Sequence, residues 1–94
     1  MYEVTKIFSF DAAHRILDYV GKCGVNHGHR FVVEVTLRRN YLENDMLVDF
    51  SVLKKVVNNK IINRLDHTTL NNIVNFNPTA ENLAKYIYDE LKPC

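Results

Sequence analysis

Hydrophobic and polar residues alternate over the first ten positions of the chain, a pattern typical of a β-strand with one buried face. The apolar residues Tyr2, Val4, Phe8 and Phe10 occupy even-numbered positions and would share one face of the strand. A second alternating run covers residues 30–38, with aromatic and β-branched side chains on one face and mostly charged or polar ones on the other. The first half of the chain therefore predicts two strands.

The hydrophobic period changes from that of a strand to that of a helix in the second half. Residues 40–45 have the composition of a turn, and residues 46–48 predict a short return strand. Asp49 or Ser51 is placed to cap a helix in which apolar residues recur every four positions. These recurring residues are Leu53, Val57, Ile61 and Leu65.

Residues 71–78 are polar and indicate a turn, after which Thr79 is placed to cap a second helix that stops near Pro93. The apolar stripe of this helix comprises Ala80, Leu83, Ala84, Ile87 and Leu91. The order β-β-(β)-α-α predicts an α+β fold with both helices on one face of an antiparallel sheet. We expect residues 1–94 to form a single domain.

Composition narrows the classes of protein. The 94 residues are 47% hydrophobic and 24% charged, as in ordinary globular proteins, and the net charge of +1 argues against a broad nucleic-acid surface. We find neither a membrane-length apolar run nor a secretory signal, and two cysteines make no disulfide framework. A cytoplasmic protein without membrane or nucleic-acid partners is expected, and so small a domain often depends on a metal or on other subunits.

Three of the four histidines are candidate metal ligands. His27 and His29 open the second strand, where side chains two apart share a face, and Gly28 between them adds no bulk. His14 can join them if the first strand continues that far and pairs with the second. Three imidazoles with one open position are typical of a catalytic zinc site. A His-x-His pair in a strand is also common at surfaces and in cores, so spacing alone leaves both interpretations open.

Two further features are candidates for proton transfer. Cys23 lies four residues before His27 and beside a lysine, where a nearby dication would lower its pKa; a partly buried, inert cysteine is the alternative. Asp66 precedes His67, and a carboxylate that orients an imidazole produces a proton donor or acceptor near pH 7. Adjacent residues rarely face each other well, so Asp66 serving only as a turn cap is the alternative.

Five short motifs follow one another along the sequence and are most informative when they are taken in that order. They are Phe10-Asp11-Ala12-Ala13-His14-Arg15, Cys23-x-x-x-His27-Gly28-His29, Val48-Asp49-Phe50, Leu65-Asp66-His67-x-x-Leu70-Asn71 and Pro78-Thr79-Ala80-Glu81-Asn82-Leu83-Ala84. In this order they resemble the family of 6-pyruvoyltetrahydropterin and 6-carboxytetrahydropterin synthases, and the resemblance covers essentially the whole chain.

The resemblance implies a tunnelling fold, in which the sheets of several subunits join into a barrel, as a trimer or a hexamer. It implies zinc held by His14, His27 and His29, with 7,8-dihydroneopterin triphosphate as the substrate. Cys23 would be the general base, and Asp66 with His67 the proton relay. Thr79 and Ala80 match positions that help to hold the pterin.

Two details of the sequence bear on this expectation. In the 6-carboxytetrahydropterin synthases of the queuosine pathway the cysteine stands four residues before the His-x-His pair, as Cys23 does in this chain, whereas the 6-pyruvoyl enzymes usually have a longer gap. The family also continues into two more strands that carry a pterin-anchoring glutamate. This sequence ends at Lys92-Pro93-Cys94. We therefore expect a C-terminally short domain without that anchor, which leaves a non-catalytic, zinc-stabilised protein as an alternative.

Overall fold

Two long strands dominate the structure, a computed structural model that describes residues 1–18, 20–21 and 24–92. Strands β1 (Tyr2–His14) and β2 (His27–Arg39) pair antiparallel along their whole length, from Tyr2↔Arg39 to His14↔His27. Both predicted strands are confirmed, and each extends to the histidine at its end. Strand β3 (Thr68–Thr69) pairs parallel with Ala12 and Ala13, which gives the sheet order β2-β1-β3. The sheet is therefore mixed and not antiparallel throughout as predicted, because β3 reaches β1 after a helical connection and not through a hairpin.

The two faces of the β1–β2 hairpin have different chemistry, which sets its register. On the inner face Phe10 stacks on Phe31 with 5.1 Å between ring centroids, and Val35 is buried beside them. Polar pairs cross between the strands on the outer face. They are Glu3–Arg38 at 2.8 Å, Thr5–Thr36 at 2.9 Å and Asp11–Arg30 at 3.1 Å.

The first predicted helix forms as one helical run with a wider turn in its middle. It consists of α1 (Phe50–Val57), the π-helical η2 (Asn58–Ile62) and α2 (Asn63–Leu65). Asp49 caps it by accepting a hydrogen bond from the Ser51 N–H at 2.9 Å. Residues four apart drift by about 40° per step around a regular α-helix. The π-turn reduces this drift, and all four predicted core positions are buried.

The second predicted helix is α4 (Ala80–Leu91), and Thr79 caps it by accepting from the Asn82 N–H at 3.1 Å. Leu83 and Ile87 are buried as predicted. Ala80 and Ala84 are exposed instead, because they line an open groove of about 720 Å³ between α4 and the inner face of β2. In the described part of the chain, no strand pairs with the β2 edge beside this groove.

Two sequence-based expectations about short elements were wrong. Residues 46–48 form no strand: Glu43 and Met46 make a single bridge around Asn44 and Asp45, whose positive φ angles of 51° and 63° close a tight turn. The chain then buries Leu47 and enters the cap of α1 instead of extending along the sheet. The stretch predicted as a turn after residue 70 contains the one-turn helix α3 (Leu70–Ile73), which Leu70 anchors in the core.

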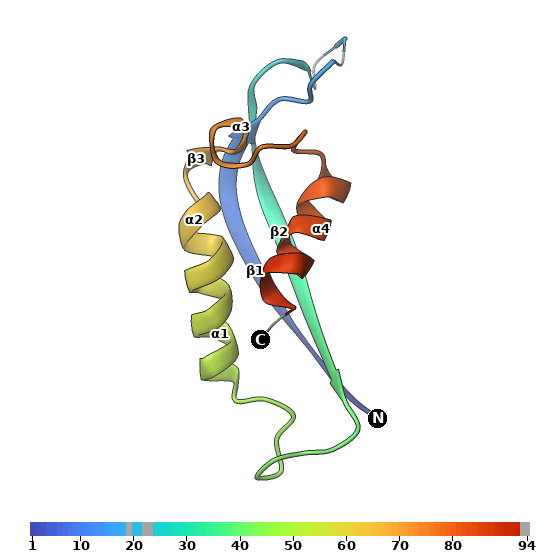
Figure 1. Ribbon diagram of the computed structural model, residues 1–94. Helices are drawn as coiled ribbons and strands as arrows, with labels where there is room; N and C mark the ends of the chain where they lie inside the picture. Colours follow the sequence, from blue (N-terminus) through green and yellow to red (C-terminus); the bar gives the residue numbers. More distant parts are fainter. Residues whose placement is uncertain (19, 22–23, 93–94) are drawn as a thin grey trace.

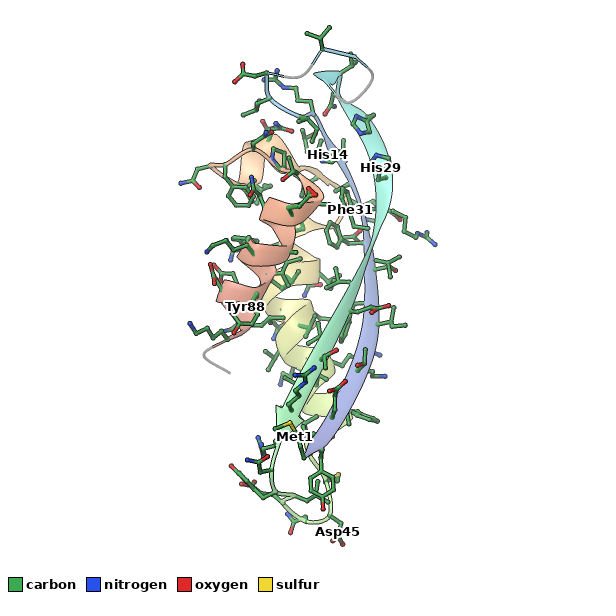
Figure 2. All side chains as sticks on the ribbon, turned by 90° about the vertical axis from the view of Figure 1, so that its right-hand side faces the viewer. Met1, His14, His29, Phe31, Asp45 and Tyr88 are labelled. Carbon is green, nitrogen blue, oxygen red and sulfur yellow. The ribbon has the colours of Figure 1, made fainter. Side chains whose placement is uncertain are left out.

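Helices cover one face of the sheet, as the sequence predicts (Figures 1 and 2). Figure 1 shows the α1–α2 run and α4 lying side by side along the hairpin. Val57, Ile61, Leu65 and Leu70 have no exposed surface and form the centre of the core. The molecule is elongated, 51 × 22 × 19 Å, so the two ends of the hairpin are well separated. None of the described helices has the length and apolarity needed to span a membrane.

Candidate metal centre and active site

Three histidines meet where β1 ends and β2 begins. The register pairs His14 with His27 and Ala12 with His29, so the three side chains share the inner face of the sheet. One ring nitrogen of each lies within 4.8 Å of the others. His14 is buried, His27 is half-buried and His29 is exposed. Figure 2 shows His14 and His29 close together at the upper end of the sheet, just above Phe31.

Backbone carbonyls orient two of these rings. His14 Nδ1 lies 2.7 Å from the Pro78 carbonyl oxygen, and His27 Nδ1 lies 2.7 Å from that of Val25. A carbonyl only accepts hydrogen bonds, so each Nδ1 carries the proton and each Nε2 keeps its lone pair. Metal-binding histidines generally have their second nitrogen held in this way. Both rings are thus fixed in the tautomer that binds a metal through Nε2.

The electrostatics of the cluster favour the neutral form of the His14 ring. Burial lowers the pKa of His14, and the neighbouring His27 and His29 lower it further, while the bond to the Pro78 carbonyl acts in the opposite direction. His14 is therefore neutral near pH 7, and a metal binds only the neutral imidazole. Three imidazole nitrogen donors with exposed His29 at the rim fit a divalent transition metal that keeps a position open for another ligand.

Asp66 and His67 form a hydrogen-bonded pair in the turn between α2 and β3. Asp66 Oδ2 lies 2.9 Å from His67 Nδ1, and Asp66 Oδ1 accepts from the Asp11 N–H at 2.8 Å. The His67 N–H donates to the Asp11 carbonyl at 2.6 Å. His67 has a φ of 58°, and this left-handed backbone lets two adjacent side chains face each other. Asp66 therefore contacts the imidazole as well as the strand.

These contacts keep the Asp66 carboxylate charged. The Asp11 N–H lowers the pKa of Asp66 most, and the hydrogen bond and positive charge of His67 lower it further. The His67 side chain is 81% exposed, so its second nitrogen, Nε2, faces solvent. An imidazole held at Nδ1 by a carboxylate and open at Nε2 is able to take or give a proton there.

The Asp66–His67 pair lies against the face of the sheet opposite to the three histidine rings. The His67 N–H bonds the Asp11 carbonyl just before the β1–β3 pairing begins at Ala12↔Thr68, and the side chain of Asp11 lies on the outer face with that of Arg30. A shallow recess of about 440 Å³ on this side is lined by Asp11, Ala12, Ala13, Gly28, His29, Arg30, His67 and Thr68. A Cβ at Gly28 would meet no atom within 4 Å, so the recess is open above the glycine.

The remaining predicted site residues are distributed as follows. Thr79 and Ala80 begin α4 directly after Pro78, whose carbonyl holds His14, so they lie next to the histidine cluster. The Thr79 hydroxyl is engaged in capping α4. Cys23, the predicted general base, lies outside the residues that the structure describes.

Sequence reasoning missed the part that Pro78 plays. Pro78 is completely buried, and its carbonyl is the acceptor that fixes the tautomer of His14 from 64 positions away in the chain. Every residue type has a backbone carbonyl, so no residue pattern could have indicated this bond. The only feature of the sequence that pointed to this position was Pro78 itself, the first residue of the motif from Pro78 to Ala84.

The structure so far defines a small α+β protein with a cluster of three histidines that could hold a divalent metal, and with an aspartate–histidine pair. Comparison with protein families identifies the class of protein more closely. Residues 3–94 match the family model described as 6-pyruvoyl tetrahydropterin synthase. The chain belongs to this family.

Individual relatives agree with the family match. A protein of Archaeoglobus fulgidus named "Putative 6-carboxy-5,6,7,8-tetrahydropterin synthase" is 45% identical over 83 residues, which cover 88% of this chain and 70% of that protein. The 6-carboxy-5,6,7,8-tetrahydropterin synthase of a Synechocystis species is 38% identical over 98% of this chain and 76% of its own length. The solved 6-pyruvoyl tetrahydropterin synthase of Caenorhabditis elegans superposes with a TM-score of 0.86 at 30% identity, over 98% of this chain and 77% of that one.

Proposed function

We propose that this chain is a zinc-dependent enzyme of the 6-carboxytetrahydropterin synthase type that acts on 7,8-dihydroneopterin triphosphate, toward queuosine-type deazaguanines. The observation that carries the proposal is the cluster of His14, His27 and His29, with two rings fixed for binding through Nε2. The names of the Archaeoglobus and Synechocystis relatives support the carboxy branch. The spacing of four residues between Cys23 and His27 supports it too.

The proposed chemistry divides between the metal and the side chains. When bound, zinc supplies Lewis-acid polarisation of an oxygen on the substrate side chain, which acidifies the neighbouring C–H. Cys23, as a thiolate, removes a proton from that carbon. His67 gives or takes a proton at Nε2, while the charged Asp66 holds its Nδ1–H. Thr79 and Ala80, next to the cluster, contact the pterin.

The position of the Asp66–His67 pair supports a homo-oligomer, a trimer or a hexamer. The pair and the three histidine rings lie on opposite faces of the same sheet. A substrate molecule bound on the inner face, among the three histidine rings, is therefore on the other side of the sheet from the His67 side chain of the same chain. Another copy that places its outer face against the histidine cluster would bring the two parts of the site together. Sedimentation of the zinc-loaded protein tests this, and a monomer with full activity would contradict it.

The deciding experiment is incubation of the purified, metal-quantified protein with 7,8-dihydroneopterin triphosphate, with products followed by mass spectrometry. Release of acetaldehyde and triphosphate together with 6-carboxytetrahydropterin is the expected result. Triphosphate without acetaldehyde would instead assign the 6-pyruvoyl activity, which the description of the family and the name of the Caenorhabditis structure favour. One zinc per chain without turnover would indicate a non-catalytic protein that keeps the metal for stability.

Variants separate the roles of the residues. Cys23→Ala is expected to abolish turnover and to leave zinc content and fold intact, because the thiolate is assigned to proton transfer only. Cys94→Ala, at the other cysteine of the chain, is the matched control and is expected to retain activity. His27→Ala is expected to lose the metal together with the activity. A Cys23→Ala protein as active as the wild type would refute the assignment of Cys23 as the base.

A further inference from the structure

The chain leaves the sheet immediately after the first histidine of the cluster. Strand β1 ends at His14, and residues 15–26 connect it to β2 and include Cys23. The backbone of Arg15 and of Leu17 has left the ladder between the strands, so its N–H and C=O groups need other partners. Asparagine side chains from two other segments supply them.

Asn71, on α3, binds both backbone groups of Arg15. Its Oδ1 accepts from the Arg15 N–H at 2.9 Å, and its Nδ2 donates to the Arg15 carbonyl at 3.0 Å. This pair of bonds reproduces what a neighbouring strand would offer. Only an amide carries a donor and an acceptor side by side, so aspartate at this position cannot make both bonds.

Asn77 binds the same segment two residues further along. Its Oδ1 accepts from the Leu17 N–H at 2.8 Å. Its own carbonyl accepts from Asn82 Nδ2 at 3.0 Å and from the Thr79 N–H at 2.8 Å, which ties it to the start of α4. The next residue is Pro78, whose carbonyl orients His14. One short segment thus holds both the ring of His14 and the backbone that follows it.

The supports of these two asparagines are themselves well fixed. Asn71 follows Leu70, which is fully buried, and β3 just before it pairs with Ala12 and Ala13 of β1. Asn77 precedes Pro78, which is also fully buried. The hydrophobic core therefore fixes the positions of the Asn71 and Asn77 side chains, and these side chains fix the backbone conformation of the residues that follow His14.

We propose that Asn71 and Asn77 are positioning residues of the metal centre. They hold the backbone of Arg15 and Leu17, so that His14 keeps the orientation in which its Nε2 meets the metal together with His27 and His29. The proposal rests on the proposed zinc site and adds two residues that bind no metal themselves. Partners that hydrogen-bond a ligating side chain directly typically contribute about 10–100-fold to metal affinity, and these asparagines act one step further out, on the backbone that follows His14.

The test measures zinc affinity in the full chain, by competition with a chromogenic chelator, for the wild type, Asn71→Asp and Asn77→Ala. Asn71→Asp is nearly isosteric; it replaces the donor to the Arg15 carbonyl with a carboxylate oxygen and adds a negative charge. Asn72→Ala is the matched control, since Asn72 is the exposed neighbour on α3 and its side chain makes no hydrogen bond with the described residues. Far-ultraviolet circular dichroism and urea unfolding of the metal-free proteins report the fold separately.

We expect zinc affinity to fall by about tenfold or more in both variants and to stay unchanged in Asn72→Ala. The visible absorption of bound Co²⁺ is expected to change in Asn71→Asp, which a purely structural role would not produce. Zinc affinity within threefold of the wild type, in a variant that folds, would overturn the proposal. If Asn71→Asp does not fold, Asn77→Ala decides. A wild-type protein that binds no zinc would refute the metal site itself, a separate outcome from failure of the asparagines alone.

Discussion

Two of the three candidate metal ligands, His14 and His27, differ in their surroundings, and this predicts different costs for replacing them. His14 is buried at 6% exposure, donates to the buried Pro78 carbonyl and meets Phe31 edge-on at 5.2 Å between ring centroids. His27 is half-buried, and its partner is a carbonyl only two residues away in the exposed connection. The prediction compares His14→Ala with His27→Ala, both with zinc and without it.

Without metal, His14→Ala leaves a buried carbonyl without a donor and loses an aromatic contact, which together cost about 2–4 kcal/mol of unfolding free energy. His27→Ala frees only the exposed Val25 carbonyl, which water can satisfy, and loses ring contacts with His14 and His29. Its metal-free cost is therefore expected to be smaller, about 1 kcal/mol or less. Zinc at one hundred times its dissociation constant stabilises the wild type by about 2.7 kcal/mol. Both variants are expected to lose most of this gain, because each removes one of three ligands.

Urea unfolding followed by circular dichroism at pH 7.5, once with a chelator and once with zinc, measures the unfolding free energy of the wild type and of both variants in each condition. The metal site would be refuted by a His27→Ala protein that zinc stabilises as strongly as the wild type. Equal metal-free stability of His14→Ala and His27→Ala would show that the bond to the Pro78 carbonyl adds nothing to the stability of the fold, contrary to the prediction. The slope of each unfolding curve serves as the control, since a changed slope means a changed unfolded or native state.

Three further predictions concern the core, a cap and pH. Ile61→Ala is expected to cost about 2–5 kcal/mol in urea unfolding, because Ile61 is fully buried at the π-turn, whereas exposed Lys55→Ala should stay within about 0.5 kcal/mol; equal effects would contradict the helix register. Asp49→Ala is expected to cost about 1 kcal/mol, since it removes the acceptor for Ser51, and an unchanged midpoint would refute the cap. Contacts with the Asp11 N–H and with His67 lower the pKa of Asp66 in the folded protein. The ionised carboxylate therefore contributes fully to the free energy of unfolding above its unfolded pKa of about 3.9, and this contribution is lost as the pH falls through the lower pKa of the folded state. The stability difference between wild type and Asp66→Asn should therefore shrink below about pH 4, and a difference that stays constant down to pH 3 would refute the inference.

The elements with strong periodicity were predictable from the sequence, and the reasons are local. Thr79 caps α4 and Asp49 caps α1 because their side chains bond N–H groups two or three residues ahead. The parity of β1 and β2 also placed the three histidines on one face, which the register confirms. These predictions depend on contacts between residues close in sequence, or on a period that the whole strand repeats.

Features that depend on single long-range contacts were not predictable. Strand β3 has only two residues, and its pairing with Ala12 and Ala13 depends on where the buried Leu65 and Leu70 place it. The bonds that orient His14 and His27 end on backbone carbonyls, which carry no sequence signal. The Asp66 and His67 side chains face each other because His67 has a positive φ, a backbone conformation that few residues other than glycine adopt.

The two parts of the candidate site are therefore held by different forces. The histidine cluster is fixed by the register of the hairpin, since shifting β2 by one residue would turn His27 and His29 to the other face. The Asp66–His67 pair is fixed by the core, because the fully buried Leu65 and Leu70 bracket it in sequence. Substitutions in the core are thus expected to disturb proton transfer before metal binding. Conversely, loss of zinc is expected to leave the Asp66–His67 pair in place, since none of its hydrogen bonds reaches a histidine of the cluster.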